Sequence, residues 1–216
     1  MIIYKRGSRG EMVKQIQKAL AGAGLKVIVD GIYGAITEEA VWTFQIKNGL
    51  KADGIVGPAT LAKLIPKRFK KSKRNITEII VHCTATPEGR DKSVAQLRAE
   101  HTAPVAKGGR GWSDIGYHYV IHLDGSIEDG RDVDIVGAHC TGHNTHSIGV
   151  VYVGGMDKQN KNPKDTRTNA QKAALMSLLI DLKKLYPKAV IYGHRDFANK
   201  ACPSFDATKE YRRLLK

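Results

Sequence analysis

Two histidines and a cysteine have the side-chain types and the positions needed to bind a metal ion. His82 and His194 each follow a short apolar run, residues 78–81 and 189–192, which is the pattern of a buried strand that ends at a histidine. Cys202 lies eight residues after His194. Two imidazoles and one thiolate are three of the four ligands of a tetrahedral zinc ion, and an open fourth position is typical of catalytic zinc. These residues therefore indicate the metal centre of a zinc hydrolase.

The chain contains eight histidines, so this ligand set has competitors. His82 and Cys83 are neighbours on one predicted strand and point to opposite faces, so only one of them can join the site. We expect His82 to be the ligand, because ligands gather at strand ends, and Cys83 to be a buried apolar residue. The segment His139–His146 holds three histidines and a cysteine and is a rival local site. The histidines without any partner pattern are expected at the surface or in packing: His101, His118 and His122.

Length and composition limit the class of protein. A chain of 216 residues forms one large domain or two small ones. No segment has the length of an apolar transmembrane helix, and the first residues lack the apolar core of a secretory signal peptide. We therefore expect the protein to stay in the cytoplasm of the cell that makes it. The three cysteines are an odd number and are expected to be reduced there.

The charge is strongly positive and unevenly distributed. The formal net charge of +14 indicates a polyanionic partner: nucleic acid, anionic lipid or bacterial cell wall. Residues 67–75 carry six basic and no acidic groups, so nearly half of the excess lies in this short stretch. Like charges repel, which predicts an extended linker over residues 67–75. A solvated tether is the simpler reading, and an anchor on phosphate polymers or nucleic acid is the alternative.

Residues 1–66 have the pattern of a small helical domain. Apolar residues at helical spacing predict one helix over residues 11–20, and a second begins with Thr37 as its N-cap. The phrase Asp-Gly-Ile-x-Gly-x-x-Thr occurs twice, at residues 30–37 and 53–60. A repeated turn without function would explain this pattern too. The repeat resembles the three-helix peptidoglycan-binding domain of many wall hydrolases, over about residues 7–65.

From residue 76 onward, strand patterns alternate with helix patterns. Strands are predicted over residues 76–82, 117–123, 126–128 and 147–153, and a last strand ends at His194. Helices are predicted to begin at the capping boxes Ser93–Gln96 and Thr168–Gln171. The pattern predicts an α/β domain with a mixed central sheet and flanking helices.

Eight short segments of this second region follow one another in the order of a known family. They are Val81–Ala85, Gly116–Tyr119, Asp124–Glu128, Gly137–His139, Asn144, Ser147–Val150, Gly193–His194 and Lys200–Asp206. On these motifs, residues 77–206 resemble the zinc-dependent N-acetylmuramoyl-L-alanine amidases of type 2. That family includes the amidase-type phage lysozymes and the animal peptidoglycan recognition proteins. Spacing alone leaves open whether both histidines are incidental, and the resemblance favours the metal site.

The resemblance also implies roles for particular residues. It implies that His82, His194 and Cys202 bind Zn²⁺ and that Tyr117 and Lys200 assist the chemistry. Lysine stands at position 200 where other members carry threonine, which points to the phage lysozyme branch. The candidate substrate-binding residues are His139, Asn144 and Trp112. A general base is not assigned, because the His-Glu-x-x-His helix of metalloproteases is absent from the sequence.

These implications combine into one predicted function. We expect a peptidoglycan-binding domain at residues 1–66, a basic linker at 67–75 and a zinc amidase at 76–216. The substrate would be the amide between N-acetylmuramic acid and L-alanine of bacterial peptidoglycan. A monomeric phage endolysin, released by a membrane-permeabilising partner and not binding nucleic acid, fits these features. The alternatives are a wall-recognition protein without catalysis, a bacterial or prophage remodelling amidase, and a nucleic-acid- or polymerase-binding regulator.

Overall fold

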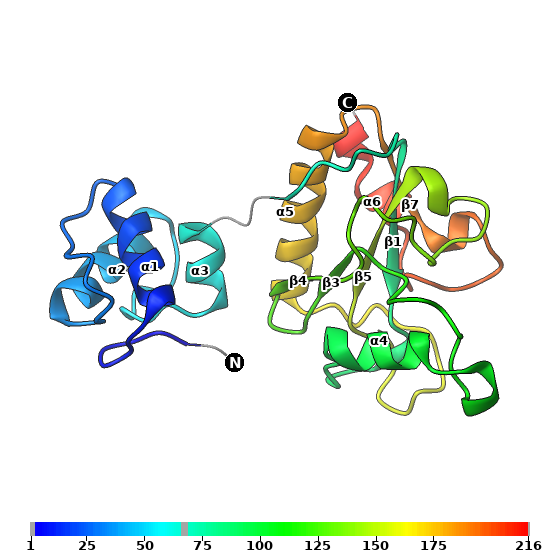
Figure 1. Cartoon of the computed structure of the whole chain (residues 1–216), viewed down its shortest axis with the longest axis horizontal. Helices are drawn as coiled ribbons and strands as arrows, with labels where there is room; N and C mark the ends of the chain where they lie inside the picture. Colours follow the sequence, from blue (N-terminus) through cyan, green and yellow to red (C-terminus); the bar gives the residue numbers. More distant parts are fainter. Residues whose placement is uncertain (1–2, 66–68, 216) are drawn as a thin grey trace. The chain divides into compact units, whose positions relative to one another are not determined.

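The computed structural model describes residues 3–65 and 69–215, which form two compact units divided near residue 68 (Figure 1). The first unit contains α1 (Glu11–Gly22), α2 (Ala35–Lys47) and α3 (Pro58–Leu64). Their apolar faces enclose a small core that includes Ile16 and Val41, both fully buried. The predicted small helical domain is therefore present, with three helices.

Each copy of the repeated phrase is held by a buried glutamine of the preceding helix. In the first copy, Gln17 Nε2 donates to the Thr37 hydroxyl, and Gln17 Oε1 accepts from the Gly31 backbone N–H. Gly31 has a φ of +78°, a left-handed conformation that favours glycine. In the second copy, Gln45 makes the same contacts to Thr60 and Gly54 and to the aspartate and isoleucine of the phrase.

These contacts correct one prediction. Thr37 is not the N-cap of α2, because the helix begins two residues earlier and Gly34 occupies the N-cap position. The Thr37 hydroxyl is engaged with a glutamine 20 residues away, a contact that local sequence does not reveal. Asn48 is the C-cap of α2, and Gly49 follows it with a φ of +64°.

The second unit is built on a five-stranded mixed sheet with the order β4-β3-β5-β1-β7. The strands are β1 (Glu78–Cys83), β3 (Tyr119–Ile121), β4 (Ile127–Asp129), β5 (Ser147–Tyr152) and β7 (Val190–Gly193). All neighbouring pairs are parallel except β3 and β4, which form the predicted hairpin. A separate pair is formed by β2 (Thr86–Pro87) and β6 (Gly155–Met156).

The predicted flanking helices are present, and they pack on both faces of the sheet (Figure 1). The helices are α4 (Val94–Thr102), α5 (Asn169–Leu185) and the short α6 (Ala207–Glu210), with 3-10 turns η1 (Val105–Lys107), η2 (Asn144–His146), η3 (His194–Asp196) and η4 (Arg212–Leu215). Both predicted capping boxes are formed, at the starts of α4 and α5. Among the described residues, no helix is long and apolar enough to cross a membrane.

The alternation of side chains along β1 separates two neighbouring residues. Ile79, Val81 and Cys83 belong to the core on the α5 side of the sheet. His82 is paired in register with Val151, which belongs to the core on the α4 side. The prediction that His82 and Cys83 point to opposite faces is therefore confirmed.

The expectation of an extended linker over residues 67–75 is wrong for its described part. Residues 69–75 pack on the second unit. The ring of Phe69 lies edge-on to Tyr119 with a centroid distance of 5.2 Å, and Lys70 Nζ lies 2.6 Å from an oxygen of Asp134. Opposite charges and carbonyl groups of the folded unit offset the repulsion among the lysines and arginines, which composition alone does not reveal. Residues 67 and 68 lie outside the described residues.

Candidate active site

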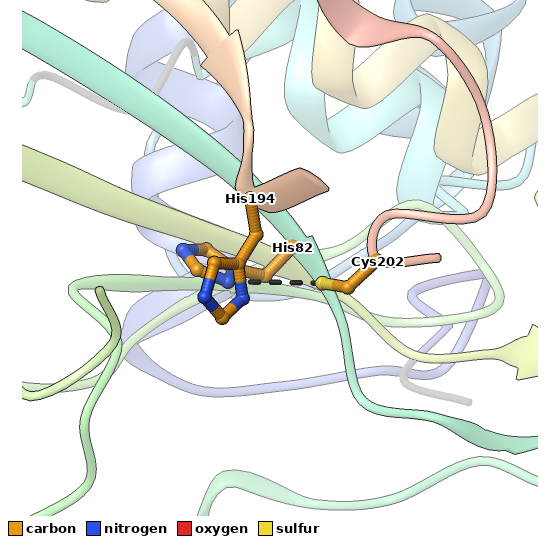
Figure 2. Close-up of side chains that lie close together, drawn as sticks. All are labelled: His82, His194 and Cys202. Atoms are coloured by element: carbon orange, nitrogen blue, oxygen red, sulfur yellow. Dashed lines mark hydrogen bonds between the residues drawn. The ribbon is translucent and has the colours of Figure 1, made fainter. Parts of the chain in front are cut away.

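The metal-binding residues predicted from sequence converge at one edge of the sheet (Figure 2). β1 and β7 are adjacent and parallel, so their carboxyl ends meet at the same edge. His82 lies near the end of β1, and His194 is the first residue of η3, directly after β7. Cys202 approaches from the following loop, with its Sγ 3.8 Å from His82 Nδ1. Ligand atoms of these three residues all lie within 4.8 Å of one another.

This donor set fits a tetrahedral zinc ion. Zinc–nitrogen and zinc–sulfur bonds of roughly 2.05 and 2.3 Å place two ligand atoms about 3.6 Å apart in a tetrahedral site. The observed separation of 3.8 Å between Cys202 Sγ and His82 Nδ1 is close to that value. Two imidazoles and a thiolate leave a fourth position for water or substrate. The three residues are therefore suited to hold zinc without rearrangement of the strands.

The local environment favours the protonation states that metal binding needs at the histidines. Burial, followed by the nearby His139 and His194, lowers the pKa of His82 well below its ordinary value. Burial and Lys200 lower the pKa of His194. Both imidazoles are thus neutral near pH 7 and able to bind a cation. The Cys83 thiol and burial raise the pKa of Cys202, so its thiolate form requires a bound cation.

A cavity of about 410 Å³ lies beside these residues. His82 is only 1% exposed and does not line it. The other sequence-predicted site residues all line it: Trp112, Tyr117, His139, Asn144, His194, Lys200 and Cys202. Residues as far apart in sequence as Cys83 and Cys202 therefore contribute to one hollow. Its size suits part of a glycopeptide.

Tyr117 and Lys200 bring different properties to the cavity wall. The ring of Tyr117 packs against the ring of His82, with a centroid distance of 5.2 Å. Burial, followed by the charges of Cys202 and Cys83, raises the pKa of Tyr117, so its phenol stays protonated and can donate a hydrogen bond. Lys200 is exposed and provides an ammonium group at the rim.

His139 and Asn144 make contacts inside the protein as well as lining the cavity. His139 Nδ1 lies 3.1 Å from His82 Nε2, so one ring orients the other. The Oδ1 atom of Asn144 accepts hydrogen bonds from the backbone N–H groups of His139 and Cys140, both at 2.9 Å. Asn144 thereby shapes the loop that carries His139. The sequence predicted only a substrate-binding role for His139 and Asn144, and these internal contacts add a structural one.

Arg110 is a cavity residue that sequence reasoning did not single out. It lines the hollow, and its guanidinium lies 5.2 Å from the ring centre of Trp112. A cation stacked on a half-buried aromatic residue of a cavity wall is a good contact for a carboxylate or a sugar face. Arg110 is flanked by Gly109 and Gly111, and Gly111 has a φ of +65°. This glycine-rich loop is the sequence signal that could have identified Arg110.

The rival histidine-rich segment does not form a local site. His139 faces His82, whereas His143 and His146 both contact Glu78, at the other end of β1. The expectation that the remaining histidines serve in packing is confirmed for two of them: His101 and His118 are buried and accept backbone hydrogen bonds. His122 is also nearly buried, between two carboxylates.

A mixed α/β sheet that brings a His-His-Cys donor set, a protonated phenol and a lysine to one cavity is typical of a hydrolase, with the three donors as a candidate metal centre. Residues 72–205 match the family model of N-acetylmuramoyl-L-alanine amidase, and residues 9–64 match that of a peptidoglycan binding domain. The chain belongs to the N-acetylmuramoyl-L-alanine amidase family, and it carries a peptidoglycan-binding domain before its amidase domain.

Curated relatives and solved structures agree with this assignment. The chain is 46% identical to an endolysin of Klebsiella phage KP32 over 134 residues, 62% of this chain and 84% of the relative. It is 42% identical to an endolysin of Escherichia phage T7 over 136 residues, 63% and 85% of the two chains. The amidase LysC from Clostridium intestinale URNW matches with a TM-score of 0.51 and 26% identity, over 65% of this chain and 86% of that chain. The Ph2119 endolysin from Thermus scotoductus MAT2119 bacteriophage Ph2119 matches with a TM-score of 0.53 and 25% identity, over 69% and 91%.

Proposed function

We propose that the protein is a zinc-dependent phage endolysin that hydrolyses the amide between N-acetylmuramic acid and L-alanine of peptidoglycan. The observation that carries the zinc dependence is the convergence of His82, His194 and Cys202 beside a cavity large enough for a glycopeptide. The endolysin relatives support a role in wall lysis. A partner that permeabilises the membrane would give the enzyme access to the wall.

Zinc held by these three residues supplies polarisation of the scissile carbonyl and activation of water near neutral pH. The chain's own residues do the rest. Lys200, exposed at the rim, stabilises the negative charge that develops on the carbonyl oxygen. Tyr117 stays protonated, and its hydroxyl group donates a hydrogen bond to the water, the carbonyl or the leaving amine. His139 holds the ring of His82 in orientation through the contact at Nε2.

The remaining cavity residues position the substrate in this proposal. Trp112 and Arg110 form a stacked pair on the cavity wall that suits a sugar face or a carboxylate of the stem peptide. Asn144 shapes the opposite loop. The first unit increases the local concentration of enzyme on the wall, because tethering two binding units raises the effective concentration of the second.

Digestion of purified peptidoglycan tests the reaction. The metal-loaded enzyme should release stem peptides with a free L-alanine amine, identified by mass, and a chelator should stop the release. Cys202→Ser should lose activity together with the tightly bound zinc ion of this site while it keeps its fold by circular dichroism. Cys140→Ser is the matched control, because Cys140 is a buried cysteine outside the three-residue donor set and this variant should keep its zinc. Full activity of metal-free Cys202→Ser would remove zinc from the mechanism, and cleavage at a sugar–sugar bond would overturn the reaction itself.

A further inference from the structure

A second group of metal-ligating side chains lies at the opposite end of β1 from His82. Glu78 is the first residue of β1. His143 directly precedes η2, and His146 is the last residue of η2. One oxygen of Glu78, Oε2, lies 2.9 Å from His143 Nδ1 and 3.4 Å from His146 Nε2. Ligand atoms of the three residues all lie within 4.8 Å of one another. None of the three lines the amidase cavity.

The separations suit coordination of one ion. Metal–ligand bonds of roughly 2.0–2.2 Å to nitrogen and oxygen place neighbouring ligand atoms about 3.0–3.5 Å apart, for octahedral and tetrahedral geometry. The two observed distances from Glu78 are close to this range. Two imidazoles and one carboxylate are a donor set typical of zinc and other divalent transition metals. The partial exposure of both histidines leaves room for water in the remaining positions.

The three side chains are held in place before any ion binds. The ring of His143 stacks on Phe197, with a centroid distance of 3.8 Å and an interplanar angle of 29°. Its backbone carbonyl accepts a hydrogen bond from Ser147, whose backbone is paired in register with Glu78. The Glu78 side chain is 16% exposed, and among the described residues its ion-pair partners are the two histidines alone. No lysine or arginine of that part of the chain neutralises this carboxylate.

A nearby arginine limits the affinity. Arg74 donates hydrogen bonds to the carbonyl oxygens of Asn144 and Thr145, which lie between the two histidines in sequence. Its positive charge disfavours a second cation. The cluster also lacks the thiolate of the first site. Binding at Glu78 should therefore be weaker than binding at Cys202.

We propose that Glu78, His143 and His146 form a second binding site for a divalent transition metal ion, with Zn²⁺ as the probe. The ion joins the start of β1 to the loop that carries His139 and Asn144. Binding therefore stabilises the amidase unit and this loop. The proposal does not depend on catalysis at the first site.

His122 provides a matched control. Like the cluster, it is a histidine between carboxylates: Nδ1 lies 3.4 Å from Asp91 and Nε2 lies 3.1 Å from Glu128. The two carboxylates contact opposite edges of the ring, so they cannot bind one ion together with it. Substitution of His122 removes a histidine–carboxylate contact without touching a convergent site.

Equilibrium dialysis of the untagged full chain against Zn²⁺, with metal content measured by mass spectrometry, tests the proposal. The wild type should bind a second zinc ion at higher free zinc than the first. Cys202→Ser should keep this weaker zinc, and adding His146→Gln or Glu78→Gln should remove it, whereas adding His122→Gln should not. Zinc should raise the Tm of Cys202→Ser and of Cys202→Ser with His122→Gln, and not that of Cys202→Ser with His146→Gln.

Two results would overturn the second site. The first is a folded Cys202→Ser variant that binds no zinc at all. The second is zinc binding to Cys202→Ser that persists unchanged with both His146→Gln and Glu78→Gln, because the ion would then lie elsewhere. Two separate substitutions are used so that a folding defect in one, seen by circular dichroism, does not decide the result.

Discussion

At the scale of single residues, the candidate site combines buried, uncharged side chains with an exposed, charged one. His82 is buried and neutral, and Tyr117 is kept protonated by its surroundings. Lys200, two residues from Cys202, remains exposed with its charge in solvent. Buried groups can thus bind metal and donate hydrogen bonds, while the charged group at the rim meets the substrate. Removing each group should affect a different measurable quantity.

Lys200→Ala should separate charge stabilisation from metal binding. Its zinc content should be unchanged, because the ammonium group is not a ligand, and turnover should fall about 10²–10³-fold as one electrostatic contact to the developing oxyanion is lost. Zinc content and release of stem peptides are measured on the same preparation. Lys209→Ala, another exposed lysine of this unit, should match the wild type. Equal turnover of Lys200→Ala and the wild type would exclude Lys200 from the mechanism.

Stability should depend on pH through a buried histidine outside the ligand set. Burial lowers the pKa of His118 to about 4, and its Nδ1 accepts a hydrogen bond from the Gly149 N–H. The unfolded chain binds this proton below about pH 6.5, whereas the folded chain does not. The free energy of unfolding of metal-stripped protein should therefore fall as pH drops from about 6.5 toward 4, by up to about 1.4 kcal/mol per pH unit from this group.

Urea unfolding at a series of pH values measures this effect. His118→Asn should be less stable at neutral pH, and its stability should decline less steeply in acid. The difference between the two curves isolates His118 from the other buried histidines. Parallel curves for the two proteins would show that His118 does not carry the predicted linkage.

At the scale of elements, two glycines make space for the ring that orients His82. A Cβ atom on Gly149 of β5 would lie 2.5 Å from the ring of His139, and one on Gly137 would lie 2.6 Å from it. Neither glycine has a positive φ, so close packing and not backbone conformation requires them. The strand and the loop thus hold His139 against His82, which in turn faces the metal-binding edge.

Gly149→Ala, a substitution in the sheet, should therefore weaken the candidate metal site through the His139 ring. The added methyl group should displace the His139 ring, cost about 1–3 kcal/mol of stability and weaken zinc binding. Thermal unfolding and zinc titration measure the two effects. In the double variant with His139→Ala, the methyl group no longer meets the ring, so the two stability losses should not add. Additive losses would show that the methyl group and the ring do not interact.

At the scale of the whole molecule, the chain combines a catalytic unit with a separate wall-binding unit. In the first unit, Trp42 of α2 is 48% exposed and lines a hollow of about 400 Å³ together with Arg6 and Glu38. An exposed indole beside charged groups suits the apolar face and the hydroxyl groups of a sugar. We infer that this hollow contributes to the contact with peptidoglycan.

Trp42→Ala should weaken sedimentation with insoluble peptidoglycan by about tenfold, the loss typical of a buried aromatic anchor at an interface. Hydrolysis of a soluble muramyl peptide should be unchanged, because the substitution lies outside the amidase unit. Ile28→Ala, which removes another exposed apolar side chain of the unit (59% exposed), is the control. Wall binding that is lost equally in both variants would assign the effect to general hydrophobicity.

Local patterns in the sequence were sufficient to predict much of this organisation. The capping boxes at Ser93 and Thr168 depend on neighbours within a few residues, so their positions follow from sequence. The strand-end histidines and Cys202 were found because strand alternation and metal-ligand chemistry restrict which residues can meet. The two units and the convergence of the three candidate ligands were thus predictable.

Tertiary structure decided how distant residues pair. It packed the basic residues 69–75 on the second unit, gave Thr37 a glutamine partner, and divided the histidine-rich segment between the amidase centre and Glu78. Each of these contacts joins residues that no periodicity or cap relates. The partners in these contacts are 20 or more residues away in sequence, so local patterns cannot identify them. For this reason the sequence was sufficient to predict the three candidate metal ligands of the amidase cavity, and only the fold placed a second set of donors at the far end of the same strand.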